Sequence, residues 1–424
     1  MKDTTIIFGG DGYIGWPLAL RLAWASDSNV VIVDSQVTRR LVASVGSDSL
    51  VRIGTPSARI SAYERASGRS NVKFVDADAR DPAAVDAVIA RHLPKNVVHL
   101  AQQRSAPFSM IDQEHALYTQ LNNVATNLNV IFSMVRHVPD AHLLKMGTMG
   151  EYGTPNIEIP EGPVTVERRG RKDKLMFPRT GQSWYHLSKV FDTHNVLLAN
   201  RIHGLTTTDV MQGVVYGSVT DETVEDSLAT RFDFDSVWGT VINKYVVQAV
   251  ILNKLLIYGK GGQSRGYLSL YDSIKCLKLL LDNPPPAGEY RLVNQIDETF
   301  DTLQLARRVE KVAEEFGVHP SFERVTNPRV EKEQHYYRVE HRLLPSLGFT
   351  RTKGIDDVLR EVFRTVLANK SRAKEMRSLL APSVAWAGQK GITSGGFRLP
   401  RDLTGWSPWQ EVVEFARETP TGTG

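Results

Sequence analysis

Residues 4–23, TTIIFGGDGYIGWPLALRLA, decide how this chain folds. The stretch begins with a short β-branched and apolar run, continues through three glycines spaced three residues apart, and ends in a leucine-rich, helix-like segment. A second apolar run, NVVIVDS at residues 29–35, ends in Asp34, which follows the last glycine by roughly the 20 residues that a dinucleotide-binding motif requires. This order of strand, glycine turn, helix, strand and acid predicts a nucleotide-binding unit.

Each part of this motif has a physical role. Gly9 permits a tight turn, Gly12 lets the backbone approach a pyrophosphate, and Gly15 lets helix and strand pack closely. The helix N-terminus faces the phosphates, and Asp34 accepts a hydrogen bond from a ribose hydroxyl. A carboxylate there repels a 2′-phosphate and so favours NAD, although the arginines at 39–40 soften that preference. Glycines also occur in plain turns, but the flanking strand and helix favour the binding loop.

The same alternation of strands and helices continues along the chain. Further strands are expected in NVKFVDADARD at 71–81, KNVVHLAQQRS at 95–105 and HLLKMGT at 142–148. Alternating elements of this kind predict an α/β fold with a parallel, doubly wound sheet. Ligands bind at the carboxyl ends of the strands in such a sheet. That rule places four strand-end residues at the site: Gln102, Gln103, Arg104 and Thr148.

The composition limits the classes of function. The chain has 424 residues, of which 42% are apolar, and its 51 basic and 47 acidic residues leave a net charge of only +4. A nucleic-acid-binding protein is not expected from so small a basic excess. The single cysteine, Cys276, permits no intrachain disulfide and fits a reducing compartment. No apolar run approaches a membrane span of roughly 20 residues, so we expect a soluble cytoplasmic protein, or a mature form stripped of a leader, without a membrane partner.

A tyrosine and a lysine downstream suggest a reaction. In SWYHLSKVFDTHNV, residues 183–196, Tyr185 and Lys189 are four residues apart and share one face of an expected helix. A lysine ammonium lowers the pKa of a nearby phenol and makes it a usable base, and it can also hold a ribose hydroxyl. Such pairs are common on solvated helix faces. The nucleotide motif upstream and Thr148 at a central strand end favour the catalytic interpretation.

Thr148, Tyr185 and Lys189, in that order, resemble the catalytic set of the extended short-chain dehydrogenase/reductase branch. Asn122, in QLNNVATNLNV, is similar to an asparagine that contacts the cofactor in that branch. The resemblance implies removal of hydride from a secondary alcohol. Tyr185 takes the hydroxyl proton, Lys189 supports the tyrosinate, Thr148 hydrogen-bonds the same oxygen, and NAD accepts the hydride.

Longer stretches carry a more specific resemblance, which covers nearly all of residues 4–390. The stretches are GGDGYIGW at 9–16, QQRSAPFSMID at 102–112, GTMGEYGTPNI at 147–157, YHLSKVFDTHN at 185–195, QGVVYG at 212–217, YGKGGQSRGYL at 258–268 and NPRVEKEQHYY at 327–337. Together they resemble the UDP-sulfoquinovose synthase family, which makes the head-group donor of sulfolipid.

That resemblance implies a reaction on UDP-glucose or a related nucleotide sugar, together with sulfite or a sulfite-donating protein. Tightly held NAD oxidises C4 of the glucose, and the 4-ketone acidifies the C5 proton. Water then leaves from C6 to give a 4-keto-5,6-ene, sulfite adds at C6, and the hydride returns to C4. The resemblance also implies a homodimer or a larger oligomer, and no metal is expected.

The stretch KMGTMGEYG, residues 145–153, departs from related sugar-nucleotide 4,6-dehydratases. Those enzymes place an Asp-Glu pair after the threonine, whereas this chain has Met149 and Gly150, with Glu151 one residue later. A small, partly apolar floor suits the entry of sulfite, because an aspartate would repel the anion by on the order of 1 kcal/mol at close range. Met149 is expected as a wall or as core packing. Glu151 is expected as an acid or base, or as a turn cap.

Further residues are expected at the site. Arg104 holds sulfite or the sugar, unless it forms a structural ion pair. His186 donates to sulfite, unless it is a packed or surface histidine, and Gln212 contacts the sugar. The expected cofactor contacts are Gly9, Asp11, Gly12, Tyr13, Ile14, Gly15, Asp34, Arg39, Asp78, Ala79, Gln102, Asn122, Tyr185, Lys189 and Val215. The expected substrate contacts are Arg104, Thr148, Gln212, Gln263, Arg265 and Arg329, of which the last three bind the diphosphate.

The chain is expected to divide into three parts. Residues 1–217 form the NAD-binding domain, in which a charged insertion at about 155–182 forms a hairpin over the site. Residues 218–390 form a smaller mixed α/β domain for the nucleotide sugar, with C-terminal helices. The tail at 391–424 contains Trp406 and Trp409, which dock either on the body or on a partner subunit.

Three positions differ from the family pattern. Gln102 replaces a glutamate, Met211 replaces an asparagine that would contact the substrate, and Tyr271 replaces an arginine. Two alternatives therefore accompany the main hypothesis. The first is a nucleotide-sugar epimerase or dehydratase that works without sulfite. The second is a non-catalytic NAD-binding sensor or scaffold, against which the intact threonine, tyrosine and lysine argue.

Overall fold

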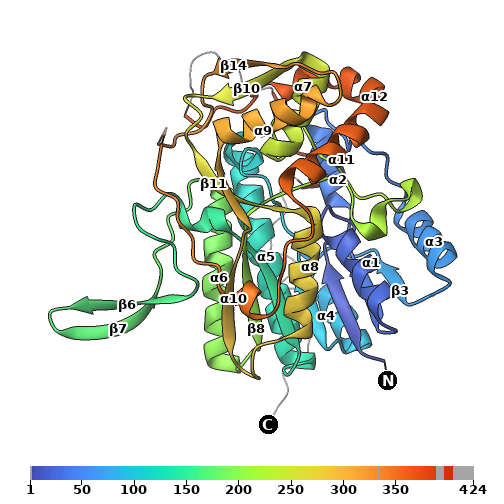
Figure 1. The fold of residues 1–424 in the computed structure, drawn as a ribbon. Helices are drawn as coiled ribbons and strands as arrows, with labels where there is room; N and C mark the ends of the chain where they lie inside the picture. The colour runs from blue at the N-terminus through green and yellow to red at the C-terminus, as the bar shows by residue number, and fades with distance from the viewer. Residues whose placement is uncertain (1, 333, 388–395, 404–424) are drawn as a thin grey trace, which may run out of the picture.

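The chain folds around a seven-stranded sheet in a computed structural model that describes residues 2–332, 334–387 and 396–403 (Figure 1). Its strands are β1 (Thr4–Phe8), β2 (Asn29–Val33), β3 (Val72–Val75), β4 (Asn96–His99), β5 (His142–Thr148), β8 (Thr207–Gln212) and β12 (Tyr290–Gln295). The order across the sheet is β12-β8-β5-β4-β1-β2-β3, and all neighbours are parallel. The predicted doubly wound α/β fold is therefore confirmed.

Helices cover both faces of this sheet (Figure 1). One layer contains α4 (Pro82–His92), α5 (Gln113–His137) and α6 (Trp184–His203), and the other contains α1 (Gly15–Ala25) and α8 (Leu270–Asp282). Side chains of β1 alternate between the two layers: Ile6 and Phe8 pack toward α4, α5 and α6, whereas Ile7 packs toward α1 and α8. Burial on both faces explains why the strands are continuous apolar runs in the sequence.

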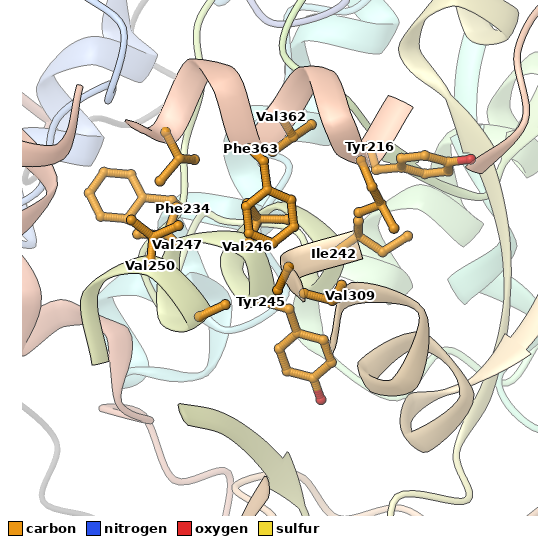
Figure 2. Close-up of a cluster of buried hydrophobic side chains, with 14 of the residues drawn as sticks. Tyr216, Phe234, Ile242, Tyr245, Val246, Val247, Val250, Val309, Val362 and Phe363 are labelled. Atoms are coloured by element: carbon orange, nitrogen blue, oxygen red, sulfur yellow. The ribbon is translucent and has the colours of Figure 1, made fainter. Parts of the chain in front are cut away.

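A smaller part of the molecule lies above the carboxyl ends of the strands (Figure 1). It contains a sheet ordered β13-β11-β9 and a parallel pair, β10 with β14. The strands are β9 (Val214–Tyr216), β10 (Lys254–Tyr258), β11 (Ser264–Ser269), β13 (Glu298–Asp301) and β14 (Ser321–Val325), and the helices are α7 (Val241–Leu252), α9 (Thr302–Glu314), α11 (Ile355–Ala368) and α12 (Lys370–Glu375). Figure 2 shows its core, where Val246 of α7, Val309 of α9 and Phe363 of α11 meet.

The two parts are not consecutive in the sequence. The predicted boundary after residue 217 leaves β12 in the second segment, although β12 forms the edge of the large sheet beside β8. Helix α8 also packs on α1 of the first segment. The chain therefore crosses between the two parts more than once, and the cavity between them is lined from both.

A charged hairpin forms the predicted insertion. Strands β6 (Pro163–Arg168) and β7 (Arg171–Met176) pair antiparallel and project away from the body (Figure 1). The expectation that the hairpin covers the site is wrong for its strands, because none of their residues lines the cavity described below. Only the segment that returns from the hairpin reaches it, through Gln182.

The remaining helices are short or lie at the periphery. They are α2 (Val37–Ser44), α3 (Pro56–Ser67), α10 (Leu343–Ser346) and the 3₁₀ turns Phe108–Met110, Met149–Tyr152, Asp221–Thr223, Asp226–Leu228, Arg377–Leu380 and Arg401–Leu403. Leu399 and Leu403 pack with Leu41 and Val42 of α2. Trp406 and Trp409, predicted to dock, lie outside the described residues. Within the described ranges, every helix is too short or too polar to cross a bilayer.

Candidate active site

A cavity of ≈ 440 Å³ opens at the carboxyl ends of the central strands and continues into the smaller part. It has a nucleotide end beside the β1–α1 turn, a middle at the end of β5, and a second end beside β10 and β11. The predicted site residues that line it are Gly9, Asp11, Gly12, Tyr13, Ile14, Gly15, Asp34, Asp78, Ala79, Gln102, Arg104, Asn122, Thr148, Tyr185, His186, Lys189, Gln212, Val215, Gln263, Arg265 and Arg329. Two predicted residues, Arg39 and Glu151, do not line it.

The β1–α1 turn fits a dinucleotide. Gly9 has φ +82°, and a Cβ there would lie 2.6 Å from the carbonyl carbon of Leu100. A Cβ on Gly15 would lie 2.4 Å from the oxygen of Gly9, so the helix can start this close to the strand only with glycine. Helix α1 has no acidic residue in its first turn and no side-chain cap. No carboxylate and no side-chain cap therefore competes with a pyrophosphate at this helix N-terminus.

Asp34 lies at the end of β2, where a ribose hydroxyl is expected. It accepts hydrogen bonds from the backbone N of Asp11 at 3.0 Å and of Gln36 at 2.6 Å. Burial, reinforced by the Asp11 carboxylate, raises the pKa of Asp34 to about 6. Arg39 binds both oxygens of Asp11 at 2.8 Å, and Arg40 pairs with Asp402. Arg59 also binds Asp11, at 2.6 Å, so Arg39 shares this carboxylate with a second guanidinium.

Thr148, Tyr185 and Lys189 meet at the middle of the cavity. Thr148 ends β5, and its side chain lies close enough to Tyr185 on α6 to lower the pKa of the phenol. Burial lowers the pKa of the Lys189 ammonium to about 8. Burial also raises the pKa of the Tyr185 phenol and outweighs the opposing effects of Arg104 and Thr148. The lowered phenol pKa that the tyrosine–lysine spacing predicts is therefore not found.

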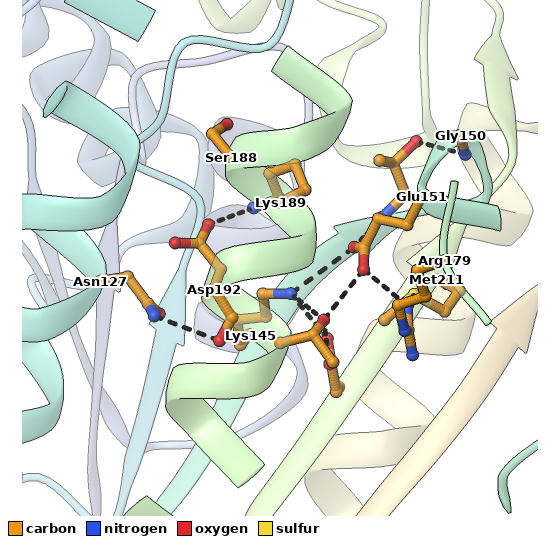
Figure 3. A network of polar contacts seen from close by, with 12 residues as sticks. Asn127, Lys145, Gly150, Glu151, Arg179, Ser188, Lys189, Asp192 and Met211 are labelled. Atoms are coloured by element: carbon orange, nitrogen blue, oxygen red, sulfur yellow. Dashed lines mark hydrogen bonds and ion pairs between the residues drawn. The ribbon is translucent and has the colours of Figure 1, made fainter. Parts of the chain in front are cut away.

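Gln102 links Lys189 to a buried carboxylate that sequence reasoning missed. Its side-chain oxygen accepts from Lys189 Nζ, and its Nε2 donates to Asp192 Oδ2 at 2.7 Å. Asp192 lies one turn beyond Lys189 on α6, and the two charged groups are 3.3 Å apart (Figure 3). Both the oxygen and the nitrogen of the Gln102 side-chain amide are thus hydrogen-bonded within the protein, beside the cofactor end of the cavity.

Glu151 lies beneath the cavity in a fully buried network (Figure 3). One oxygen accepts from the backbone N of Thr148 at 3.2 Å, which completes a capping box around the turn Met149–Tyr152. The other accepts from Arg179 at 2.6 Å and from Thr193 at 3.0 Å. With both oxygens engaged below the floor, the geometry favours the cap over the acid or base.

Two more charged groups complete this network. Lys145 of β5 lies 3.1 Å from Asp209 of the adjacent strand β8 and 3.7 Å from Glu151, and both Lys145 and Asp209 are fully buried. The Asp209 and Glu151 carboxylates raise the pKa of Lys145 despite its burial. The four charges, two of each sign, hold the end of β5, and therefore Thr148, in place.

The floor of the cavity is small because a histidine covers it. A Cβ on Gly150 would lie 2.3 Å from the Nε2 of His186, so the imidazole ring occupies the space of a side chain at this position. Ser183 fixes the ring through a 3.0 Å contact with Nδ1. Burial lowers the pKa of His186 to about 3, which keeps the ring neutral. Met149 lines the cavity and also packs in a buried apolar cluster, so both expectations for it hold.

Arg104 lines the cavity and also forms an ion pair. Its guanidinium lies 2.5 Å from Asp233, which also binds Arg231 at 2.9 Å. Both arginines line the cavity. Because two guanidinium groups share one carboxylate, a positive charge is left over to attract an anion.

The second end of the cavity gathers basic and aromatic side chains. Gln263 comes from the β10–β11 turn, Arg265 from β11, and Arg329 from the segment after β14. Arg265 pairs with Glu331 at 2.5 Å. The Arg329 guanidinium lies 5.4 Å from the ring centre of Trp386.

Sequence reasoning missed two residues at this end. They are Lys244 of α7, which donates to Tyr258 OH at 3.1 Å and lines the cavity, and Trp386 itself. For Lys244, the only indication in the sequence was an isolated lysine within an apolar helix. Trp386 gave no local signal, because it reaches the cavity from a distant part of the sequence.

Two of the three departures from the family pattern lie away from the cavity. Met211 is fully buried in β8, with its sulfur 3.2 Å from Arg179 beneath the floor. Side chains alternate along a strand, and the neighbouring Gln212 lines the cavity while its amide donates to Ser273 at 3.0 Å and to Gln295 at 3.1 Å. Tyr271 is buried in α8, where Lys353 lies 4.0 Å from its ring centre. An effect on the substrate through a direct contact of Met211 or Tyr271 is therefore not supported.

The glycine turn, the threonine–tyrosine–lysine set and the two-ended cavity define a dinucleotide-dependent enzyme site of the extended short-chain dehydrogenase/reductase type. Residues 5–294 match the NAD dependent epimerase/dehydratase family. The chain is 45% identical over 383 residues to UDP-sulfoquinovose synthase of Sulfolobus acidocaldarius, which covers 90% of this chain and 97% of that protein. It therefore belongs to the NAD dependent epimerase/dehydratase family, in the group of the UDP-sulfoquinovose synthases.

Two further comparisons agree. The chain is 41% identical over 386 residues to the chloroplastic UDP-sulfoquinovose synthase of Spinacia oleracea, which covers 91% of this chain and 79% of that protein. The fold is similar to that of UDP-glucose 4-epimerase from Bifidobacterium longum in complex with NAD+ and UDP, with a TM-score of 0.64, 20% identity, and coverage of 87% of this chain and 99% of that one.

Proposed function

We propose that this protein makes a sulfonated nucleotide sugar from UDP-glucose and sulfite, using a tightly held NAD. The observation that carries the proposal is the convergence of Thr148, Tyr185 and Lys189 between a dinucleotide end and an arginine-lined end of one cavity. Bound NAD supplies an acceptor for the C4 hydride, and its positive charge favours the tyrosinate. The glycine turn and Asp34 hold it.

The protein side chains then have distinct roles in the proposal. Tyr185 takes the proton of the sugar C4 hydroxyl, the Lys189 ammonium stabilises the tyrosinate, and Thr148 hydrogen-bonds the same oxygen. Gln212 contacts the sugar. Gln263, Arg265 and Arg329 bind the diphosphate, because guanidinium and amide donors match its oxygens.

Sulfite enters over the small floor at Gly150. The arginine pair of Arg104 and Arg231 attracts the anion, since Asp233 balances only one of them. His186 is neutral and can donate one N–H to the anion or to the departing C6 oxygen. A separate protein can supply the sulfite, as the resemblance implies.

The proposal also includes a homo-oligomer that works in the cytoplasm. Helix α6 exposes Trp184, Phe191 and Leu198, each seven residues apart and each about half exposed. The neighbouring α5 adds Leu117 and Phe132. A contiguous apolar face of this kind fits a second copy of the chain. The cytoplasmic location is supported by the single, buried cysteine.

Product mass tests the proposal. Purified protein is incubated with UDP-glucose, with and without sulfite, and the nucleotide sugars are identified by mass spectrometry. We expect a sulfonated sugar only with sulfite and wild-type protein, and none with Tyr185→Phe. A dehydrated or epimerised sugar that forms equally well without sulfite would instead support the dehydratase or epimerase, and unchanged turnover by Tyr185→Phe would remove the catalytic assignment.

A further inference from the structure

A buried carboxylate accompanies the active-site lysine. Asp192 is fully buried on α6, does not line the cavity, and lies 3.3 Å from the Lys189 ammonium. Isolated buried carboxylates are costly, so a carboxylate at this depth requires a partner of opposite charge. Among the described residues, this ion pair is the one that Lys189 makes.

A neutral bridge holds the pair together. Gln102 accepts from Lys189 and donates to Asp192 and to the backbone oxygen of Asn123, the last at 2.9 Å. An amide can make both contacts because it carries a donor and an acceptor. A glutamate at 102 would instead place a second carboxylate beside Asp192 and Lys189.

The other charged groups around Lys189 are already balanced. Lys145 on β5 pairs with Asp209 on β8, and Glu151 pairs with Arg179. His99 at the end of β4 is fully buried, and burial holds its pKa well below its ordinary value, so it carries no charge. Asp192 is thus the group that compensates the Lys189 charge directly.

We propose that Asp192 is a positioning residue for hydride transfer, which keeps the Lys189 ammonium charged and directed at the cavity through a direct ion pair and the Gln102 bridge. This inference rests on the proposed function, in which the ammonium supports the tyrosinate. Lys189 touches the reacting groups, whereas Asp192 acts only through Lys189.

The test compares Asp192→Asn, Asp192→Glu and wild type in the reduction of bound NAD by UDP-glucose across a range of pH, with Asp226→Asn, an exposed carboxylate, as the control. An opposite charge at this distance typically shifts a pKa by about 1–3 units. We expect the alkaline limb of the rate profile to move down by about 1–3 pH units in Asp192→Asn and to return toward wild type in Asp192→Glu. An unmoved limb in folded Asp192→Asn overturns the inference.

A second variant and a second measurement keep the test independent of folding and of turnover. Gln102→Glu adds negative charge beside Lys189 and should move the same limb upward; no shift, or a shift downward, contradicts the inference. The Lys189 titration is also followed by NMR of carbon-13-labelled lysine, with its signal assigned from Lys189→Met. If wild type shows no sugar-dependent NAD reduction, the proposed function fails, while the NMR titration still decides whether Asp192 sets the charge of Lys189.

Discussion

The imidazole ring of His186 lies directly against Gly150, where an added Cβ would stand 2.3 Å from the ring Nε2. Ser183 caps α6 and holds the ring through Nδ1, so the ring cannot withdraw without breaking this contact. The floor of the cavity is therefore built from a backbone and a neutral histidine. The ring fills the space above Gly150, and no acidic side chain of the described residues lines the cavity floor at this point.

Gly150→Ala should displace His186 and lower turnover of UDP-glucose and sulfite by about 100-fold, because small misplacements of reacting groups typically cost about that factor. The variant should still fold, since the ring lies beside a cavity. Gly354→Ala is the matched control: it sits at φ −69° with its nearest neighbour 3.7 Å away, and it should be fully active. Steady-state rates of both variants test whether the added methyl group displaces His186. Turnover by Gly150→Ala at the wild-type rate would show that this contact does not hold His186 in place.

Glu151→Gln should lower the free energy of unfolding by about 3–5 kcal/mol, as is typical when one member of a buried ion pair is removed. Arg179 and Lys145 would then share the single carboxylate of Asp209. Denaturant unfolding measures the change, with Glu167→Gln as the control, because the Glu167–Lys172 pair at 3.3 Å is exposed and worth at most about 1 kcal/mol. Equal stability of Glu151→Gln and wild type would contradict the structural role of Glu151.

The buried histidine His142 should make the protein sensitive to acid. It is buried in β5 with Nε2 2.9 Å from Thr208 Oγ1, and burial lowers its pKa from the ordinary 6.5 to about 4. A lowered histidine pKa means that the unfolded chain binds the proton more tightly, so stability is lost as the pH falls from about 6.5 toward 4. For this group the loss at pH 5 is about 2 kcal/mol. His142→Gln should remove that part of the pH dependence in denaturant titrations, and an unchanged slope would exclude His142 as its source.

The apolar face of α6 should mediate self-association. Leu198→Glu, at a side chain 51% exposed, should convert the oligomer into a monomer, because a charge cannot be buried there without a partner. Val224→Glu changes a residue that is 67% exposed and far from α6 in the sequence, and it should leave the oligomer intact. Sedimentation velocity distinguishes the two results, and a wild-type monomer would contradict the proposal.

Local sequence patterns predicted most of the fold. The glycine turn and the apolar strands are formed by neighbouring residues, and both were found as expected. Tyr185 and Lys189 share one helix as predicted, but the pKa of the phenol is raised and not lowered. The positions of Met211 and Arg39 were not predictable in the same way. Whether a strand residue faces the cavity or the layer beneath depends on its register, and whether an arginine is free depends on a partner such as Asp11, which the sequence alone does not identify.

Long-range packing accounts for the features that the sequence did not reveal. Asp192, Lys145 and Asp209 come from three elements, and only folding brings them together under Thr148. The return of β12 to the large sheet and the approach of Trp386 to the cavity are likewise contacts between distant segments. A resemblance can supply residue roles, but it does not show which charges are already balanced.

In the proposed reaction a hydride leaves the sugar ring at C4, stays within the site, and returns to the same carbon. UDP-glucose deuterated at C4 should be incubated with the protein and sulfite in ordinary water, and the product analysed by NMR and mass spectrometry. We expect a sulfonated nucleotide sugar that retains deuterium at C4. A sulfonated product with hydrogen from water at C4, or a failure to form any such product, would contradict it.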